Sequence, residues 1–573
     1  MEKKWWMEAV GYQIYVKSFY DSNNDGIGDL RGIIDKLDYL NHLGVNLLWL
    51  CPFYKSPMDD NGYDVSDYYD IASEYGCLDD IKELIQKAHE KGIKIIADLV
   101  LNHTSDEHPW FIESRSSLDN PKRDYYIWQK PRYKNGKEIE PTNWASFFGG
   151  SCWQKDEVTG EYYMKIFSRK MPDLNWSNPK VREEMEKMAL WWLDLGIDGF
   201  RVDAVAHLGR GNFVDSRMKS DAIYKPDWRK FSNLPILHDY LKEMNKTVFQ
   251  TKDICVVGEV GGGAKVSEAI HYAGYNSNEM NMVFNFDHNW CNNLWDINNL
   301  DDKVVFLKPL KEVFKRWQTG LQGKAWNPIY WLNHDHPRVM SSYGDVKNHK
   351  LSGKMLATAL YFMWGTPFIY NGEEIGMTNY PFTKLDEFRD VSVYNNYRIS
   401  VIEGNMDEKA FIAKSAIDTR DNARTPMQWS NKENGGFTQA KPWMNVNPNY
   451  VDINVEDQLN DEDSLFNYYR KVIDLRRNSE YKDVIVYGKY ELLFEDEPNL
   501  YVYTRKLKNK MIMVVANFYD CDTTIDLSNY KIKNLLTSNY DDFLNENGVI
   551  TIRPFESFVI DVNKKRSNPN EVK

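Results

Sequence analysis

The sequence predicts an α/β protein: an eight-stranded (β/α)8 TIM barrel with a small domain inserted after its third strand and an all-β sandwich domain at its carboxyl end. Three observations predict this architecture. Short apolar runs rich in β-branched and aromatic residues alternate with longer segments of helical period. Residues 104–175 interrupt that alternation, and strand-like runs follow residue 480. An open, doubly wound parallel sheet is the alternative that the pattern leaves open.

The expected barrel strands are eight short apolar runs. They are Gly11–Val16, Val45–Leu50, Ile93–Val100, Ile197–Val202, Ile254–Val257, Met282–Phe286, Ile329–Leu332 and Phe368–Tyr370. Between these runs, apolar residues recur at three- and four-residue intervals, which indicates amphipathic helices. The expected helices are Leu30–Leu43, Leu78–Lys91, Pro179–Leu195, Leu234–Met244 and Lys350–Trp364.

Two regions outside this alternation define the domain boundaries. The expected boundaries are 1–103 and 176–480 for the barrel, 104–175 for the inserted domain, 481–563 for the C-terminal β domain and 564–573 for a frayed polar tail. Long segments without periodicity inside a compact protein are usually functional, which applies to the insertion. After an expected helix at Leu465–Arg477, the strand candidates of the last domain are Val484–Phe494, Leu500–Leu507, Met511–Phe518 and Phe555–Val562.

Charge and composition exclude several classes of partner. The chain has 573 residues, and 71 basic against 84 acidic side chains give a net charge of −13. This balance argues against nucleic acid or an anionic membrane surface and favours a small neutral or cationic ligand. Aromatic residues make up 14% of the chain, with 19 Trp and 36 Tyr. Such an excess is typical of sugar-binding clefts, although a large core accounts for it equally well.

The cysteines and the amino end bear on location. Six cysteines are spread along the chain without metal-binding or disulfide spacing, so we expect reduced core residues and neither a zinc site nor a disulfide framework. No long apolar run follows the first lysines, so no signal peptide is expected and a cytoplasmic location is predicted. Met355–Trp364 is too short for the roughly 20 residues of a membrane span and is expected to be a buried helix. We expect a monomer or a weak homo-oligomer.

Acidic and imidazole side chains end four of the expected strands. The strand ends are Asp98–His103, Gly199–Asp203, Val257–Glu259 and Leu332–His336. Because the working groups of a parallel barrel sit at the carboxyl ends of its strands, Asp203, Glu259 and Asp335 are expected to face one mouth. Crowding and desolvation there would push the carboxyl pKa values apart, giving one ionised nucleophile and one protonated acid. For any single strand-end aspartate, a helix cap is the alternative.

These segments resemble a known family. In order, they look like the four signature regions of the α-amylase family of glycoside hydrolases (family 13), and Met171–Asn175 is similar to that family's additional motif at the end of its inserted domain. Gln13–Tyr15, Asp21–Gly32 and Asp421–Trp429 resemble the oligo-1,6-glucosidase and α-glucosidase subgroup, whose relatives include dextran glucosidase, sucrose isomerase and trehalose synthase. The resemblance covers nearly the whole chain.

The resemblance implies a retaining double displacement at the three acids. Asp203 would be the nucleophile, Glu259 the general acid and then base, and Asp335 the stabiliser of the transition state. Arg201, two residues before Asp203, is a cation that favours the ionised nucleophile. The apolar run Cys255–Val257 before Glu259 would favour the protonated acid. No organic cofactor is expected.

The resemblance also implies the first sugar site. Its residues would be Asp60, Tyr63, His103, Arg201, His334 and Arg424. Tyr63 would stack on the glucose ring, and the two histidines would bind its hydroxyls. Asp60 and Arg424 would pair beyond the non-reducing end and close the pocket, so that one terminal glucose is released at a time. The alternative for Arg424 is a surface salt bridge.

The residue after the nucleophile implies the linkage. In this subgroup a Val there accompanies α-1,6 bonds and a smaller residue α-1,4 bonds, so Ala204 favours maltose and short maltooligosaccharides. Met171, where oligo-1,6-glucosidases have Gln, points the same way. Isomaltooligosaccharides are the alternative substrates, and sucrose isomerisation or trehalose synthesis are alternative reactions. A non-catalytic amylase-like scaffold, which would lack the acids, is a remote alternative.

Asp21–Asp29 alternates oxygen ligands around a glycine turn. A structural calcium site is expected there, with magnesium as the other candidate ion, and the subgroup resemblance implies the same. The ligands would be Asp21, Asn23, Asp25, the carbonyl of Ile27, and Asp29. An Asx-rich turn without metal is the alternative. A second loop, Gly258–Lys265, nearly matches a phosphate-binding loop, but Ala264 stands where that motif needs Lys. Nucleotide binding is therefore not expected, and the glycines are expected to let the backbone pass beside Glu259.

Overall fold

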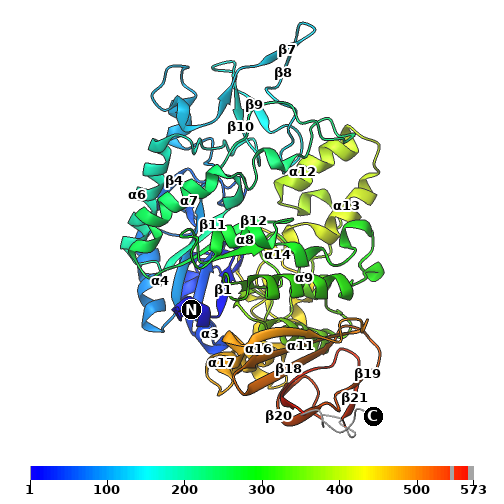
Figure 1. Ribbon diagram of the computed structural model, residues 1–573. Coiled ribbons are helices and arrows are strands. Elements are labelled where there is room, and N and C mark those ends of the chain that lie inside the picture. The colour runs from blue at the N-terminus through cyan, green and yellow to red at the C-terminus, as the bar shows by residue number, and fades with distance from the viewer. Residues whose placement is uncertain (1, 543–547, 566–573) are drawn as a thin grey trace.

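The computed structural model describes residues 2–542 and 548–565 and contains a parallel eight-stranded sheet closed into a barrel (Figure 1). The strands are β1 (Gly11–Ile14), β2 (Leu47–Leu50), β5 (Lys94–Val100), β11 (Gly199–Asp203), β12 (Cys255–Gly261), β13 (Met282–Asn285), β14 (Pro328–Ile329) and β15 (Thr366–Tyr370). Their order is β13-β12-β11-β5-β2-β1-β15-β14, and the end strands β13 and β14 contact each other. The barrel prediction is confirmed, and the open-sheet alternative is wrong because an open sheet would leave its two edge strands apart.

Helices surround the barrel and begin and end at recognisable residues. They are α2 (Leu30–Asp35), α3 (Leu37–Leu43), α4 (Leu78–Glu90), α6 (Pro179–Leu195), α7 (Ile236–Thr247), α8 (Val266–Ala273), α9 (Leu307–Leu321) and α11 (His349–Tyr361). The Asn178 side chain caps α6, Pro179 is its first residue, and Gly196 ends it in the left-handed conformation. The predicted helix 30–43 is divided at Lys36, which leaves helical geometry.

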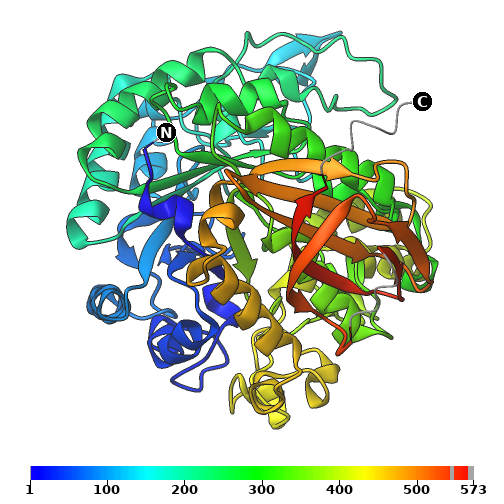
Figure 2. The ribbon, with the colours of Figure 1, turned by 60° about the horizontal axis from the view of Figure 1, so that its bottom comes forward.

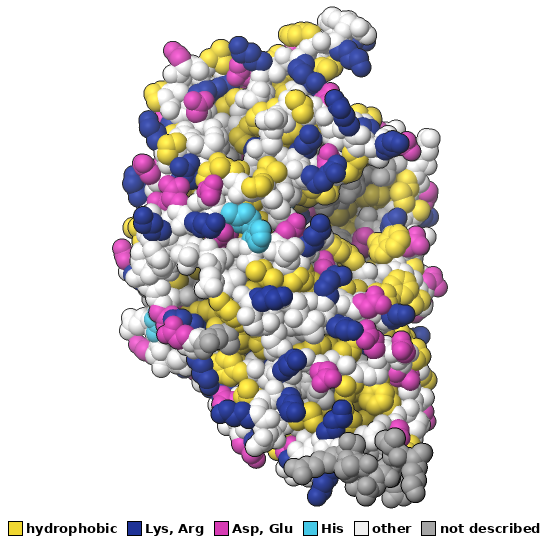
Figure 3. Space-filling model, viewed as in Figure 1, with side chains coloured by type: hydrophobic (Ala, Val, Ile, Leu, Met, Phe, Trp, Pro, Cys, Tyr) yellow, Lys and Arg dark blue, Asp and Glu magenta, His cyan; other side chains and the backbone are white. Residues whose placement is uncertain are grey.

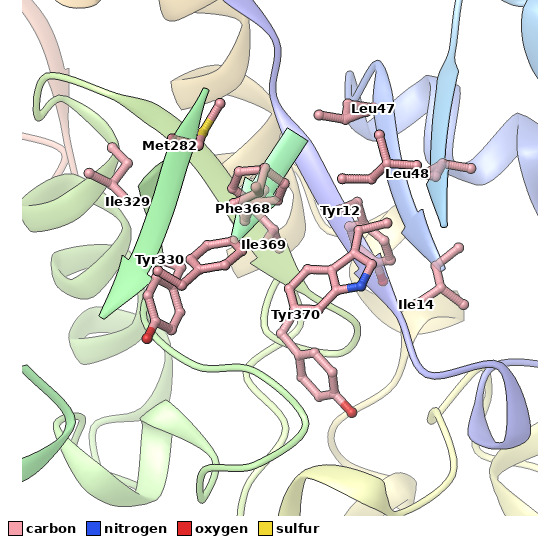
Figure 4. Close-up of a cluster of buried hydrophobic side chains, with 14 of the residues drawn as sticks. Tyr12, Ile14, Leu47, Leu48, Met282, Ile329, Tyr330, Phe368, Ile369 and Tyr370 are labelled. Carbon is pink, nitrogen blue, oxygen red and sulfur yellow. The ribbon is translucent and has the colours of Figure 1, made fainter. Parts of the chain in front are cut away.

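Aromatic side chains from opposite sides fill the barrel interior. The ring centroids of Trp49 on β2 and Phe284 on β13 lie 5.4 Å apart, and those of Phe284 and Phe368 on β15 lie 5.1 Å apart. Figure 4 shows Phe368 and Tyr330 in this cluster among aliphatic side chains of neighbouring strands. The barrel is therefore a packed core rather than a pore, and polar chemistry is confined to its ends.

The segment after β5 forms a separate small layer at the end of the barrel opposite the C-terminal domain (Figure 1). Its sheet has the order β6-β10-β9, and β7 and β8 form a hairpin. The bounds are β6 (Trp128–Gln129), β7 (Arg132–Lys134), β8 (Lys137–Ile139), β9 (Trp153–Lys155) and β10 (Tyr162–Met164). Trp144 in this layer packs against Phe213 and Phe231, which come from the loop after β11. The hydrophobic cluster of the insertion thus extends beyond residues 104–175.

A helical layer that the sequence did not indicate lies between residues 380 and 418. It contains α12 (Val391–Tyr397), a π-helical turn at Arg398–Ile402 and α13 (Glu408–Asp418). Phe382 and Phe388 stack with ring centroids 4.3 Å apart in a cluster of its own. The chain then returns to the barrel mouth through α14 (Asp421–Arg424).

After α16 (Leu465–Arg477) and α17 (Lys482–Tyr487), the chain forms a two-layer β domain (Figure 2). A five-stranded sheet of order β16-β17-β18-β22-β20 faces the pair β19-β21, with a buried aliphatic cluster between them. The strands are β16 (Lys489–Leu493), β17 (Leu500–Leu507), β18 (Lys510–Asn517), β19 (Thr523–Asp526), β20 (Tyr530–Ser538), β21 (Val549–Ile552) and β22 (Ser557–Lys564). The predicted sandwich is confirmed. The strand predicted at 484–494 is half wrong because its first part is α17, and of the predicted tail, residues 566–573 lie outside the described residues.

All six cysteines are free. Cys51, Cys152, Cys255 and Cys291 are buried as predicted, whereas Cys77 is exposed and precedes α4, so its assignment to the core is wrong. No helix within residues 2–542 and 548–565 is both long and apolar enough to cross a bilayer.

Candidate active site

One buried guanidinium connects the acids of three neighbouring strands. Arg201 Nη1 lies 2.8 Å from Asp203 Oδ1 and 2.7 Å from Asp98 Oδ1, and Arg201 Nη2 forms an ion pair with Glu259. Gly199, at the start of the same strand, packs so closely on β12 that a Cβ would overlap the carbonyl of Cys255. β11 and β12 therefore approach closely enough for their carboxylates to share one cation.

Asp98 has its remaining oxygen occupied as well. Its Oδ2 accepts hydrogen bonds from Tyr63 Oη at 2.9 Å and from Trp49 Nε1 at 3.1 Å. Asp98 is fully buried, so it is held by Arg201 and these two donors and is not free to react. From the sequence, Asp98 was expected only as the start of a motif; in the structure it anchors Arg201.

The third acid is held by a histidine and two arginines. Asp335 Oδ1 lies 3.0 Å from Arg424 Nη2 and 3.2 Å from Arg420 Nη1, and Oδ2 lies 3.3 Å from His334 Nε2. His334 Nδ1 lies 2.8 Å from Gln13 Nε2. An amide nitrogen can only donate, so Nδ1 accepts and the ring carries its proton on Nε2, directed at Asp335.

Aromatic stacking joins the two halves of the site. The rings of Tyr63 and His334 are parallel within 7°, with centroids 5.1 Å apart. The hydroxyl oxygen of Tyr63 also lies 3.4 Å from Arg201 Nη1. His103 Nε2 contacts the Tyr63 carbonyl at 3.2 Å, and burial lowers the pKa of His103 to about 3, which leaves the ring neutral. The predicted sugar-site residues therefore converge between the acid pair Asp203–Glu259 and Asp335.

One side of this site is closed by ion pairs. Arg420 Nη2 lies 3.2 Å from Asp60 Oδ1, whereas Arg424 Nη1 lies 3.9 Å from it. Arg420 is itself fixed by Asp390, which accepts from Nε at 2.8 Å and from Nη2 at 2.6 Å. The predicted partner of Asp60 was Arg424 alone, but Arg420 makes the closer contact, and Arg424 instead turns to Asp335 and the His334 carbonyl.

Electrostatics separate the acids, although not entirely as predicted. Burial raises the pKa of Asp203 to about 7, against the opposing effect of Arg201. Burial also acts on Asp335, but His334, Arg420 and Arg424 outweigh it and hold the pKa of Asp335 well below its usual range. Arg201 favours the ionised form of Asp203, as predicted, but burial has the larger effect on the pKa. Glu259 contacts Arg201, a cation that favours the ionised carboxylate, rather than purely apolar surroundings.

Ala204 has an unusual backbone conformation. Its φ is 45° and its ψ is 33°, in the left-handed region, and its side chain is 4% exposed. This turn directs the chain away from β11 directly after Asp203. A β-branched side chain is strained in this conformation. The backbone at position 204 therefore favours a small side chain such as that of Ala204, apart from any effect of this side chain on a ligand.

The predicted metal loop is held by its own hydrogen bonds. Asp21 accepts from three backbone N–H groups of the loop and from a threonine hydroxyl, and Asp29 caps α2. Asn23 and Asp25 each accept from the N–H two residues onward. Among the described residues, no three or more His, Cys, Asp or Glu side chains are grouped to hold a metal. That grouping does not include the Asn23 amide or the Ile27 carbonyl, and calcium binding stays a prediction.

Comparisons with known proteins agree with this geometry. A family model described as the catalytic domain of alpha amylase matches residues 13–488, and one described as the C-terminal domain of the alpha-amylase SusG matches residues 500–559. The chain is 50% identical to an oligo-1,6-glucosidase of Parageobacillus thermoglucosidasius over 98% of this chain and 99% of that protein. Among solved structures, it is similar to trehalose-6-phosphate hydrolase of Bacillus licheniformis (TM-score 0.89, 41% identity) and to an isomaltulose synthase of Protaminobacter rubrum (TM-score 0.92, 38% identity). Both comparisons cover 98% of this chain and 100% of the solved one.

Proposed function

The chain belongs to the α-amylase family of glycoside hydrolases, and we propose that it is a retaining α-glucosidase that releases terminal glucose from short isomaltooligosaccharides. The observation that carries the proposal is the shared guanidinium of Arg201. A retaining enzyme needs its two carboxyl groups about 5–5.5 Å apart, against roughly 6.5–9.5 Å in an inverting one. Asp203 and Glu259 contact one guanidinium from neighbouring strands, so the two carboxyl groups lie close together, which supports the retaining mechanism.

The proposed reaction uses the three acids in sequence. Asp203 attacks the anomeric carbon while Glu259 gives a proton to the leaving oxygen, and a covalent glucosyl–Asp203 ester forms. Glu259 then takes a proton from a water molecule that attacks the same carbon and regenerates Asp203. Asp335, held ionised between His334 and two arginines, supports the positive charge that develops on the sugar ring. Before the first step, substrate must separate Glu259 from Arg201 so that Glu259 can carry its proton.

The closed end of the site supports terminal cleavage. Asp60 and Arg420 form an ion pair at 3.2 Å, which in the proposed enzyme closes the pocket beyond the non-reducing glucose. Tyr63 and His334 offer ring faces and hydrogen-bonding atoms to that single sugar. A polymer that needs cleavage in its interior would not fit past this ion pair.

For the linkage, the similarity to an oligo-1,6-glucosidase at 50% identity supports α-1,6 bonds. The α-1,4 preference that Ala204 predicted finds no support in that comparison. It remains a second candidate because of one structural observation: the small side chain of Ala204 lies beside Asp203. Isomerisation or synthesis, as the name of the isomaltulose synthase indicates for that protein, would use the same acids with a different acceptor.

One experiment tests the proposal. The purified chain is incubated with isomaltose, maltose, sucrose and trehalose, and the products are followed by chromatography and by NMR of the released anomer. We expect glucose, first released as the α-anomer, and fastest from isomaltose. Release as the β-anomer would contradict retention, and faster release from maltose would favour the second candidate. No product from any of the four would contradict the α-glucosidase assignment.

Three further proposals follow from the sequence. The chain is proposed to work in the cytoplasm, as its unpaired cysteines support. It is proposed to act as a monomer or weak homo-oligomer, which size-exclusion chromatography with light scattering would test. Calcium binding at the Asp21–Asp29 loop is retained as a proposal and is tested below.

A further inference from the structure

A cavity of about 310 Å³ adjoins the candidate site on its open side. Asp335 and His336 line it together with several aromatic residues, among them Phe286, Trp290 and Trp295. These tryptophans are 53% and 59% exposed. Figure 3 shows a hollow bordered by hydrophobic side chains in the region between α13 and α9. Exposed aromatic side chains that gather in one hollow are typical of a ligand-binding groove.

Trp290 is fixed beside the loop that carries Glu259. A Cβ built at Gly262 would overlap the indole ring of Trp290, so the ring lies directly on the backbone three residues after Glu259. This contact explains the glycine at position 262, because only glycine lets the indole approach so closely, whereas Gly261 and Gly263 have positive φ angles and no such neighbour. The ring centroid of Phe286 lies 6.5 Å from that of Trp290 and 4.7 Å from that of His336. An aromatic strip therefore runs from beside Asp335 to Trp290.

The direction of the substrate places its leaving group on this strip. The non-reducing end is blocked by Asp60 and Arg420. The leaving group must therefore lie on the side of the site where Glu259 delivers its proton. Trp290 stands on that side with half its surface free, and the apolar faces of pyranose rings pack on indole rings.

We propose that Trp290 is the platform on which the leaving-group sugar of an oligosaccharide stacks, and that it sets the preference for oligosaccharides over glucosides with small leaving groups. The inference rests on the proposed α-glucosidase function and names a specificity-determining residue of the same site. Trp290 is not a catalytic residue, since it binds the part of the substrate that departs. Trp295, on the same cavity wall, is placed to contact a second leaving-group sugar.

The test compares Trp290→Ala with the unaltered chain on isomaltose, isomaltotriose and α-glucosyl fluoride. α-Glucosyl fluoride carries no sugar on the leaving-group side, so its rate of hydrolysis depends on Asp203 and the first sugar site but not on leaving-group contacts. We expect kcat/KM for the two oligosaccharides to fall about tenfold, equivalent to about 1.4 kcal/mol of binding. The fluoride should react within about twofold of the original rate, and Trp290→Phe should restore most of the loss. Tyr133→Ala, at an exposed tyrosine of the β7–β8 hairpin, is the control and should leave kcat/KM unchanged for all three substrates.

The outcomes separate this inference from the proposed function. Equal loss on the fluoride and the oligosaccharides would show that Trp290 only supports the Glu259 loop, and would overturn the inference. An unchanged rate on all three substrates would overturn it as well. If the unaltered chain hydrolyses none of them, the proposed function fails instead. Thermal unfolding of each variant shows whether a lost rate reflects a lost fold.

Discussion

Replacing Arg201 by lysine perturbs the centre of the candidate site while keeping its positive charge. Arg201 contacts Asp98, Asp203 and Glu259 at once through two nitrogens of one planar group. An ammonium is a single point on a flexible stem and cannot reproduce that geometry. We therefore expect the Arg201→Lys variant to retain one of these contacts and to lose two.

The size of the effect follows from those contacts. A hydrogen bond to a charged group contributes about 1.5–3 kcal/mol, so losing two amounts to about 3–6 kcal/mol shared between stability and catalysis. Because each 1.4 kcal/mol is a factor of ten, kcat/KM should fall about 10- to 100-fold even if only half of the loss reaches the transition state. Arg201 also opposes the rise that burial causes in the pKa of Asp203. Weakening it should raise that pKa further.

The assay is the pH dependence of kcat/KM for isomaltose. A nucleophilic carboxylate works only when ionised, so activity is present above its pKa and is lost as the pH falls through it. The acidic limb of the original chain should lie above the ordinary aspartate range, and in Arg201→Lys it should move to higher pH. Arg505→Lys is the matched control, because Arg505 on β17 is buried but donates its hydrogen bonds only to backbone carbonyl groups. A limb that stays in place in Arg201→Lys, or moves equally in the control, would refute this reasoning.

Three further predictions concern other parts of the molecule. Ala204→Val should lower the free energy of unfolding by about 1–3 kcal/mol because position 204 is buried and left-handed, and it should raise the isomaltose-to-maltose rate ratio. Denaturant unfolding measures the first effect and kinetics on both sugars measure the second. Ala204→Gly is the control without strain, and an unchanged stability or rate ratio in Ala204→Val would contradict the prediction. Arg420→Ala should lower the free energy of unfolding by about 3–5 kcal/mol because it leaves Asp390 buried without its cation. The control Arg132→Ala breaks an exposed ion pair and should lower it by less than about 1 kcal/mol. Equal losses for the two variants in denaturant unfolding would refute this prediction. A chelator should lower the melting temperature more than the turnover of the surviving enzyme, and insensitivity of both would favour a metal-free turn.

Much of the fold was predictable because it depends on local pattern. The apolar runs of the eight strands and the caps of helices such as α6 depend on residues that are adjacent in the sequence. The break at Lys36 within the first helix was not predictable, since it depends on how α2 and α3 pack. Nor was the switch from α17 to β16 within 484–494, where an apolar run of helix and one of strand look alike.

The site shows the same division. Asp203, Glu259 and Asp335 could be found because each ends a strand, and ends of parallel strands converge. The roles of Asp98 and Arg420 depend on which partners the fold brings to them from distant segments. Arg420 stands four residues before Arg424 on the same turn of chain, and this spacing was the one signal that could have identified it.

The most direct test of the central claim is to trap the glycosyl-enzyme. A slow fluorinated glucosyl fluoride is incubated with the chain, and the labelled peptide is identified by mass spectrometry after digestion. We expect one glucosyl group attached to the carboxylate of Asp203, and no label in Asp203→Asn. A label on Glu259, on Asp335 or on any other residue would contradict the arrangement described above.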